Sequence, residues 1–170
     1  MRPKLENLNE GSAADFVRWL APVFEHSPWV ADTAYASRPF ATVEALHEAL
    51  CDVVRNAEHE NQLALIRAHP DLVGRAASQG SLPAPSASEQ ASAGLDRLTS
   101  AEIEKFQTYN KAYREKFGFP FVICARLNKK EAILRGFESR LKNSREQEIQ
   151  TALEEIYKIA YLRLQDIVQP

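Results

Sequence analysis

Helical periodicity runs through almost the whole chain, and this pattern restricts most strongly the folds that its 170 residues can adopt. Between residues 42 and 57, for example, Val43, Leu46 and Leu50 recur at the spacing of one helix face. Apolar residues over 149–164 repeat the pattern. Helices with one apolar face must bury it against one another. We therefore predict an all-α fold, a bundle of about seven or eight helices with no significant sheet.

Pairs of a polar residue and an acid or amide three positions later mark where helices should start, because each side chain bonds the other's backbone N–H. Such pairs occur at Ser12 and Asp15, Thr99 and Glu102, Asn128 and Glu131, and Ser144 and Gln147. The helices expected from these signals and from periodicity cover residues 12–24, 28–37, 42–57, 62–68, 99–117, 128–137 and 144–164.

Two segments depart from the helical pattern. Residues 75–88 are small, polar and rich in proline, which predicts a loop. Residues 119–125, FPFVICA, resemble a strand, but the chain offers this segment no partner strand. We therefore predict a buried extended segment or a short buried helix there.

Composition excludes several classes of protein. The chain has 21 basic and 23 acidic residues, a formal charge of −2, which argues against an electrostatic nucleic-acid binder. No apolar stretch approaches the roughly 20 residues that cross a membrane, so no membrane partner is expected. Cys51 and Cys124 match no metal-ligand spacing and predict reduced thiols in the cytoplasm. The length predicts one domain, residues 1–170.

His69 is followed by Pro70, whose ring should end the preceding helix at the histidine. Pro70 also suits the first position of a new helix, which would place a positive helix end beside His69. Such surroundings would keep the imidazole neutral and able to accept a proton. The alternative is a polar helix breaker at the surface.

Residues 86–90 and Arg163 are the other candidates for a site. Ser86 and Glu89 have the spacing of a capping box, and Glu89 with Gln90 could instead project into a ligand pocket. Arg163 borders the apolar stripe of the last helix, so it should pair with an acid or an anionic ligand if buried. Structural partners for it would be Asp166, Glu154 or Glu155, and the alternative is a solvated arginine near the helix end.

These segments together resemble the 2-oxo-4-hydroxy-4-carboxy-5-ureidoimidazoline (OHCU) decarboxylase family. The resemblance rests on FEHSPWVADTAYASRPF (24–40), QLALIRAHPDLVG (62–74), SASEQASAGL (86–95), YNKAYREKFGFPFVICAR (109–126) and IAYLRL (159–164). It implies an all-α homodimer that uses no metal or organic cofactor and acts on a small ureidoimidazoline, forming S-allantoin in urate degradation.

The resemblance also implies roles for individual residues. The family's catalytic histidine falls on His69 and its acidic partner on Glu89. Ser86 matches the substrate-binding serine by its offset from Glu89, with Ser88 as the alternative. The residues implied to contact or support substrate binding are Pro70, Ser86, Gln90 and Arg163, with the main chain around Phe119, Phe121, Ile123 and Ala125.

Two other functions remain open from the sequence. A different cofactor-free lyase or isomerase acting on a related ureide would keep the pocket and change the substrate. A non-enzymatic helical interaction module would use His69, Glu89 and Arg163 only as caps and surface charges. No GxGxxG, Walker, HExxH or GxSxG motif is present to favour a nucleotide-binding, metalloprotease or hydrolase function.

Overall fold

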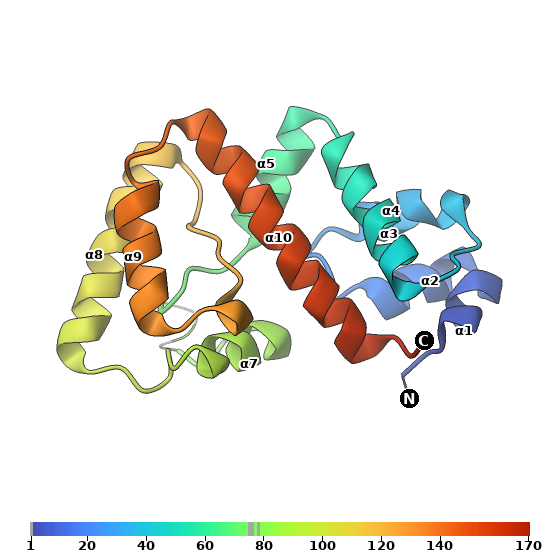
Figure 1. The fold of residues 1–170 in the computed structure, drawn as a ribbon, viewed down its shortest axis with the longest axis horizontal. Helices are drawn as coiled ribbons and strands as arrows, with labels where there is room; N and C mark the ends of the chain where they lie inside the picture. Colours follow the sequence, from blue (N-terminus) through green and yellow to red (C-terminus); the bar gives the residue numbers. More distant parts are fainter. Residues whose placement is uncertain (1, 75–76, 78) are drawn as a thin grey trace. The chain divides into compact units, whose positions relative to one another are not determined.

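The chain folds into α-helices joined by short turns, as seen in a computed structural model that describes residues 2–74, 77 and 79–170 (Figure 1). Over these residues the α-helices are α1 (Leu5–Glu10), α2 (Ala13–Leu20), α3 (Pro28–Ala34), α4 (Val43–Arg55), α5 (His59–Ala68), α7 (Ala84–Ser92), α8 (Ser100–Phe117), α9 (Lys130–Arg140) and α10 (Arg145–Ile167). Two 3₁₀ helices, η1 (Tyr35–Ser37) and η2 (Ala125–Leu127), complete them. The all-α prediction is confirmed, and α1 is a helix that the sequence patterns did not predict.

No strand forms within the described residues. Lys4 and Gln169 make an isolated parallel bridge, in which the Leu5 N–H donates to the Gln169 carbonyl at 2.9 Å. Residues 120–124 belong to no helix or strand, all but Ile123 are buried, and the backbone at Cys124 is extended, so up to this point the segment takes the non-helical form of the two predicted; Ala125 then begins η2. None of the described helices combines the length and apolar character that a membrane crossing requires.

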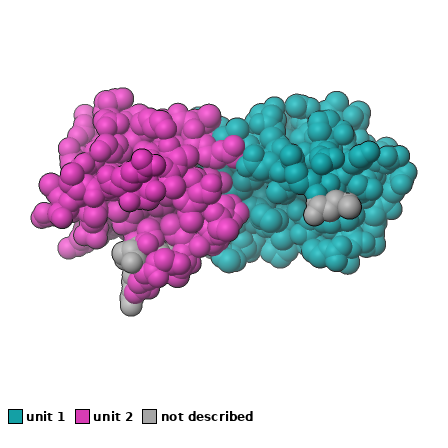
Figure 2. Space-filling model, turned by 90° about the horizontal axis from the view of Figure 1, so that it is seen from below, with its two compact units in different colours: residues 1–65, 157–170 teal, residues 66–156 magenta. Residues whose placement is uncertain are grey.

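The described chain divides into two compact units, coloured separately in Figure 2. Unit 1 comprises residues 1–65 and 157–170, and unit 2 comprises residues 66–156. Both boundaries fall inside helices, one in α5 and one in α10, so each of these helices contributes residues to both units. In unit 1, α3 packs against α2 and α4.

Three of the four predicted helix starts agree with the structure. The Ser12 and Thr99 hydroxyls accept the N–H groups of residues 15 and 102, and Ser144 and Gln147 form a reciprocal capping box. The fourth is wrong, because α9 begins at Lys130 and the Asn128 side chain donates to the Cys124 carbonyl instead. The residue at which a helix starts depends on local hydrogen bonds, so a competing side-chain bond can shift the start along the chain.

Two helix boundaries are also corrected. The first predicted helix ends at Leu20 rather than residue 24, because Pro22 lacks the N–H that a continuing helix needs. The loop predicted over 75–88 ends at Pro83, which caps α7, and Pro85 lies in the first turn, where its missing N–H costs nothing. Residues 75, 76 and 78 of that predicted loop lie outside the described residues.

The core of unit 2 holds a charged group surrounded by aromatic rings. The Glu148 side chain is fully buried and accepts hydrogen bonds from Arg140 Nε at 2.8 Å and from the Tyr113 hydroxyl at 2.6 Å. Asn143 Nδ2 donates to its other oxygen at 2.9 Å. Arg140 also donates to the Val122 carbonyl at 2.7 Å. This network therefore joins α8, α9 and α10 to the extended segment.

We predict that Arg140→Met lowers the free energy of unfolding by about 3–5 kcal/mol, because it leaves the buried Glu148 carboxylate without its cation. Denaturant unfolding followed by far-ultraviolet circular dichroism measures the loss. The matched control is Arg18→Met, whose ion pair with Asp15 is exposed and should contribute less than about 1 kcal/mol. Equal losses in the two variants would contradict the role given to the network.

Candidate active site

His69 lies directly after the last residue of α5 and is only 6% exposed. The helix therefore ends where the proline signal predicted, and burial excludes the surface helix breaker. The second half of the prediction is wrong, because residues 70–74 form turns and irregular backbone and Pro70 starts no helix. Pro70 therefore supplies no helix N-terminus beside the His69 imidazole. A short loop takes the place of the expected helix after the histidine.

Helix α7 carries the serine, glutamate and glutamine that the sequence singled out. Ser86 and Gln90 are buried, Glu89 is half-buried and Ser88 is exposed. Ser86 is the third residue of the helix and Pro83 occupies the capping position, so the structure excludes the capping-box alternative for Ser86 and Glu89. Burial favours Ser86 over Ser88 as the residue that can line an interior site.

Helix α7 packs against η2, at the end of the extended segment. Burial raises the pKa of the Cys124 thiol, and the negative charges of Glu155 and Glu89 raise it further. Glu89 therefore lies close enough to the end of the extended segment for its negative charge to affect the Cys124 thiol. These residues all belong to unit 2.

The extended segment has one edge occupied by protein side chains. The Val122 carbonyl accepts from Arg140, and the Cys124 N–H donates to Glu155 Oε2 at 3.2 Å. Successive residues of an extended chain direct their N–H and C=O groups to opposite edges. The main-chain groups of Ile123 therefore face the other edge. Phe119 and Phe121 bury their rings, and Ala125 begins η2.

Arg163 belongs to unit 1 and is 5% exposed, so the solvated arginine is excluded. Its partner is a residue that the sequence did not indicate: Nη2 donates to Glu25 Oε1 at 2.8 Å, and Nη1 donates to the Pro22 carbonyl at 3.1 Å. Glu25 is itself 7% exposed. It lies far from Arg163 in the chain, so no local spacing could have revealed the pair.

The candidate residues thus divide between the units: Arg163 belongs to unit 1, whereas His69, the α7 residues and the extended segment belong to unit 2. Asn110 of α8 is a residue of interest that sequence reasoning missed. It is 7% exposed, and its Nδ2 donates to the Leu72 carbonyl at 2.7 Å, three residues after His69. In the described part of the chain, no group of three His, Cys, Asp or Glu side chains could hold a metal ion.

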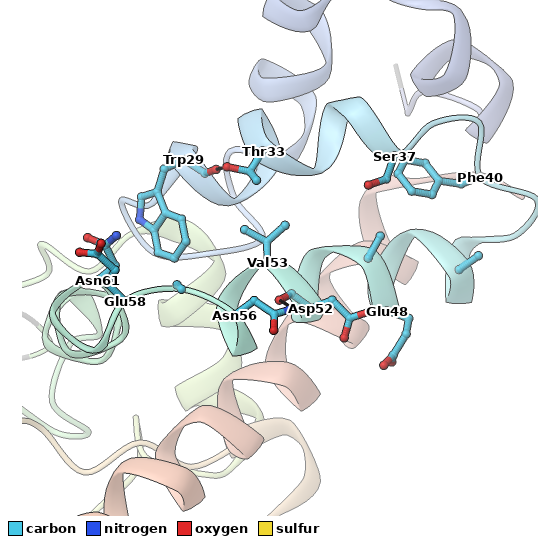
Figure 3. A pocket seen from close by; sticks show the side chains of 13 residues that line it. Trp29, Thr33, Ser37, Phe40, Glu48, Asp52, Val53, Asn56, Glu58 and Asn61 are labelled. Carbon is cyan, nitrogen blue, oxygen red and sulfur yellow. Dashed lines mark hydrogen bonds between the residues drawn. The ribbon is translucent and has the colours of Figure 1, made fainter.

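A separate cavity of about 930 Å³ lies in unit 1, with Trp29 of α3 on one side and Val53 of α4 on the other (Figure 3). Glu48 and Asp52 on its rim both accept from Arg55 Nη1, at 2.6 and 2.7 Å. Two of its three acids are thus paired with a cation, and the third, Glu58, is exposed to solvent. The lining includes none of the candidate site residues. The cavity gives no support to acid–base chemistry.

Comparisons with known proteins agree on one family. The family model described as OHCU decarboxylase matches residues 9–165. A 2-oxo-4-hydroxy-4-carboxy-5-ureidoimidazoline decarboxylase of Halalkalicoccus jeotgali is 42% identical over 169 residues, which cover 99% of this chain and 94% of the relative. The protein of the same name from Amia calva is 41% identical over 165 residues, covering 97% and 94%.

Solved structures show the same fold. The crystal structure of an (S)-allantoin synthase superimposes with a TM-score of 0.76 at 30% identity, over 97% of this chain and 54% of that one. A crystal structure of an OHCU decarboxylase in the presence of (S)-allantoin gives a TM-score of 0.72 at 24% identity, over 92% of this chain and 97% of that one. At that identity the second likeness concerns the fold alone.

We predict that both thiols react slowly with a disulfide reagent at pH 8. Burial raises the pKa of Cys51 to about 12 and also raises that of Cys124, so little reactive thiolate exists in the folded chain. Labelling by dithiobisnitrobenzoate should be at least about tenfold slower in the native protein than in guanidinium, where both thiols are exposed. Rapid labelling of either cysteine in the native protein would show that its surroundings are not as described.

Proposed function

Because this chain belongs to the OHCU decarboxylase family, we propose that it converts 2-oxo-4-hydroxy-4-carboxy-5-ureidoimidazoline to (S)-allantoin and CO₂. The observation that carries the proposal is the 42% identity, over 99% of the chain, to a relative named for this decarboxylation. The burial of His69 adds a titratable side chain away from bulk water. The proposed place of the reaction is the last step from urate to allantoin.

The proposed reaction needs few catalytic groups from the protein. The substrate carries its carboxylate on a carbon that also bears a hydroxyl, next to a ring C=N bond. When the bond to CO₂ breaks, its electron pair forms a C=C bond to the ureido-bearing carbon, and the C=N electrons move to the ring nitrogen, which takes a proton from solvent. The substrate itself thus accepts the electrons. The enol-like product is then protonated on the ureido-bearing carbon, and loss of the hydroxyl proton leaves the carbonyl of allantoin. Protonation on one face sets the configuration of the product.

We assign the proton transfer to His69, which takes the hydroxyl proton or delivers a proton to carbon, with Glu89 orienting the ureido group and tuning the imidazole. Ser86 is buried on the same helix as Glu89, which suits it to hold a polar group of the ring. Pro70 supports the histidine. The edge of the segment that Ile123 faces offers main-chain groups to a flat heterocycle.

Arg163 is the proposed partner of the anionic substrate. Its guanidinium is always charged, and Glu25 with the Pro22 carbonyl fixes its direction in unit 1. A guanidinium held in this way loses little further freedom when it binds a carboxylate or a ureide carbonyl.

We further propose that the chain acts as a homodimer in the cytoplasm and that residues 1–170 form one functional domain. Family resemblance supports the dimer. The buried free thiols of Cys51 and Cys124 support a reducing compartment. The family model spans residues of both units, which supports a single functional domain.

The direct test generates the unstable substrate from urate with the two enzymes that precede this step and monitors (S)-allantoin by circular dichroism. We expect the wild-type protein to accelerate the signal and to give one sign. His69→Asn should lower turnover by about 10²–10⁴-fold with the fold intact, since a general acid or base contributes that much. A wild-type protein that neither accelerates the signal nor biases its sign refutes the decarboxylase, and full activity in His69→Asn refutes the histidine's role.

For Arg163 we expect Arg163→Lys to lower kcat/KM by about 10–100-fold, because lysine keeps the charge but loses the planar array of donors. Steady-state rates in the same assay measure the loss. Arg97→Lys is the matched control, since Arg97 is largely exposed and its nearest acid, Asp96, is 3.8 Å away. Equal behaviour of the two variants would remove Arg163 from the substrate site.

A further inference from the structure

The loop after His69 has an unfavourable backbone conformation. Val73 has a φ of 52°, in the left-handed region that β-branched residues rarely adopt. Residues 70–74 belong to no helix, so no helix ladder satisfies their N–H and C=O groups. Such a conformation persists only where surrounding contacts hold it. The structure identifies these contacts.

Two buried carboxamides bind the main chain of three successive loop residues. Gln90 Oε1 accepts from the Val73 N–H at 3.1 Å, and Gln90 Nε2 donates to the Asp71 carbonyl at 3.2 Å. Asn110 Nδ2 donates to the Leu72 carbonyl at 2.7 Å. Gln90 and Asn110 are 6% and 7% exposed; the Asn110 bond is buried and the two Gln90 bonds are partly buried.

Packing and charge act on the same loop. The Leu72 side chain is 6% exposed and anchors the loop in the core of unit 2. Arg114 Nε lies 3.0 and 3.1 Å from the two carboxylate oxygens of Asp71. Because the Arg114 side chain is 47% exposed, that ion pair contributes little compared with the buried amide bonds.

We propose that Gln90 and Asn110 are positioning residues, which hold the loop so that the His69 imidazole points in its working direction. The inference rests on the proposed function of His69 as the acid or base. The carboxamide nitrogen carries two N–H groups and the oxygen two lone pairs, so one bond to the loop at each end leaves room for the substrate contact that the family resemblance implied for Gln90. Asn110 acquires a role that no sequence motif indicated.

The test compares Gln90→Met, Asn110→Leu and the double variant, which keep the side-chain volume and remove the amide bonds. A misplaced acid or base slows the chemical step more than it weakens substrate binding. We expect each single variant to lower kcat by about 10–100-fold while KM changes by less than about threefold. The double variant should lose less than the product of the single effects, because both residues act on one loop. Lys111→Met, next to Asn110 and exposed, is the matched control.

A different outcome would assign Gln90 to the substrate. If Gln90→Met raised KM at least about tenfold with kcat unchanged, the residue would contribute uniform binding and the positioning role would be overturned. Multiplicative losses in the double variant would likewise show that the two residues do not act through a common loop.

Nuclear magnetic resonance separates this inference from the proposed function, because it needs no turnover. In the wild-type chain the Val73 amide should exchange slowly with solvent, although it lies outside every helix, since it donates to a buried oxygen. The ¹⁵N signals of the His69 imidazole should shift in both single variants and stay in place in Lys111→Met. Rapid exchange of Val73, or unchanged imidazole signals, would overturn the positioning role even if the protein proves to be a decarboxylase.

Discussion

The buried ion pair of Arg140 and Glu148 is the interaction on which unit 2 depends. Removing two charges from water is costly, and their attraction compensates only when the remaining donors and acceptors are also satisfied. Here Tyr113, Asn143 and the Val122 carbonyl complete the set. The same bonds fix the extended segment by one edge. The helices of unit 2 and the extended segment are therefore stabilised together rather than by separate contacts.

Local signals predicted most helices, because a hydroxyl cap such as Thr99 and an apolar face such as that of α4 act within a few residues. They failed where two local choices competed. Pro83 and Pro85 start α7 before Ser86 can serve as a cap, and the Asn128 amide binds a carbonyl behind it rather than an N–H ahead. Partners distant in the chain were beyond such reasoning. The sequence predicts that a buried Arg163 pairs with an acid, but only the tertiary structure shows that this acid is Glu25.

Family resemblance implied the reaction and the residue types of the candidate site. The structure shows that the His69 and Arg163 side chains are buried, which excludes the surface interpretations of both residues. The structure also removed the helix N-terminus that had been expected beside the imidazole. A loop follows His69, and two amide side chains from α7 and α8 bind the main chain of that loop.

Gln90 and Asn110 bind main-chain atoms, which every residue type carries. Their bonds to positions 71–73 do not require a particular side chain there, so positions 71 and 73 can change in sequence during divergence, whereas position 72 must stay apolar because the Leu72 side chain is buried in the core. The residues whose type these bonds do require are the two amides, which lie far from the histidine in the chain. A search for distant homologues that weighs only the HP dipeptide would therefore overlook the two amides that bind the loop after it.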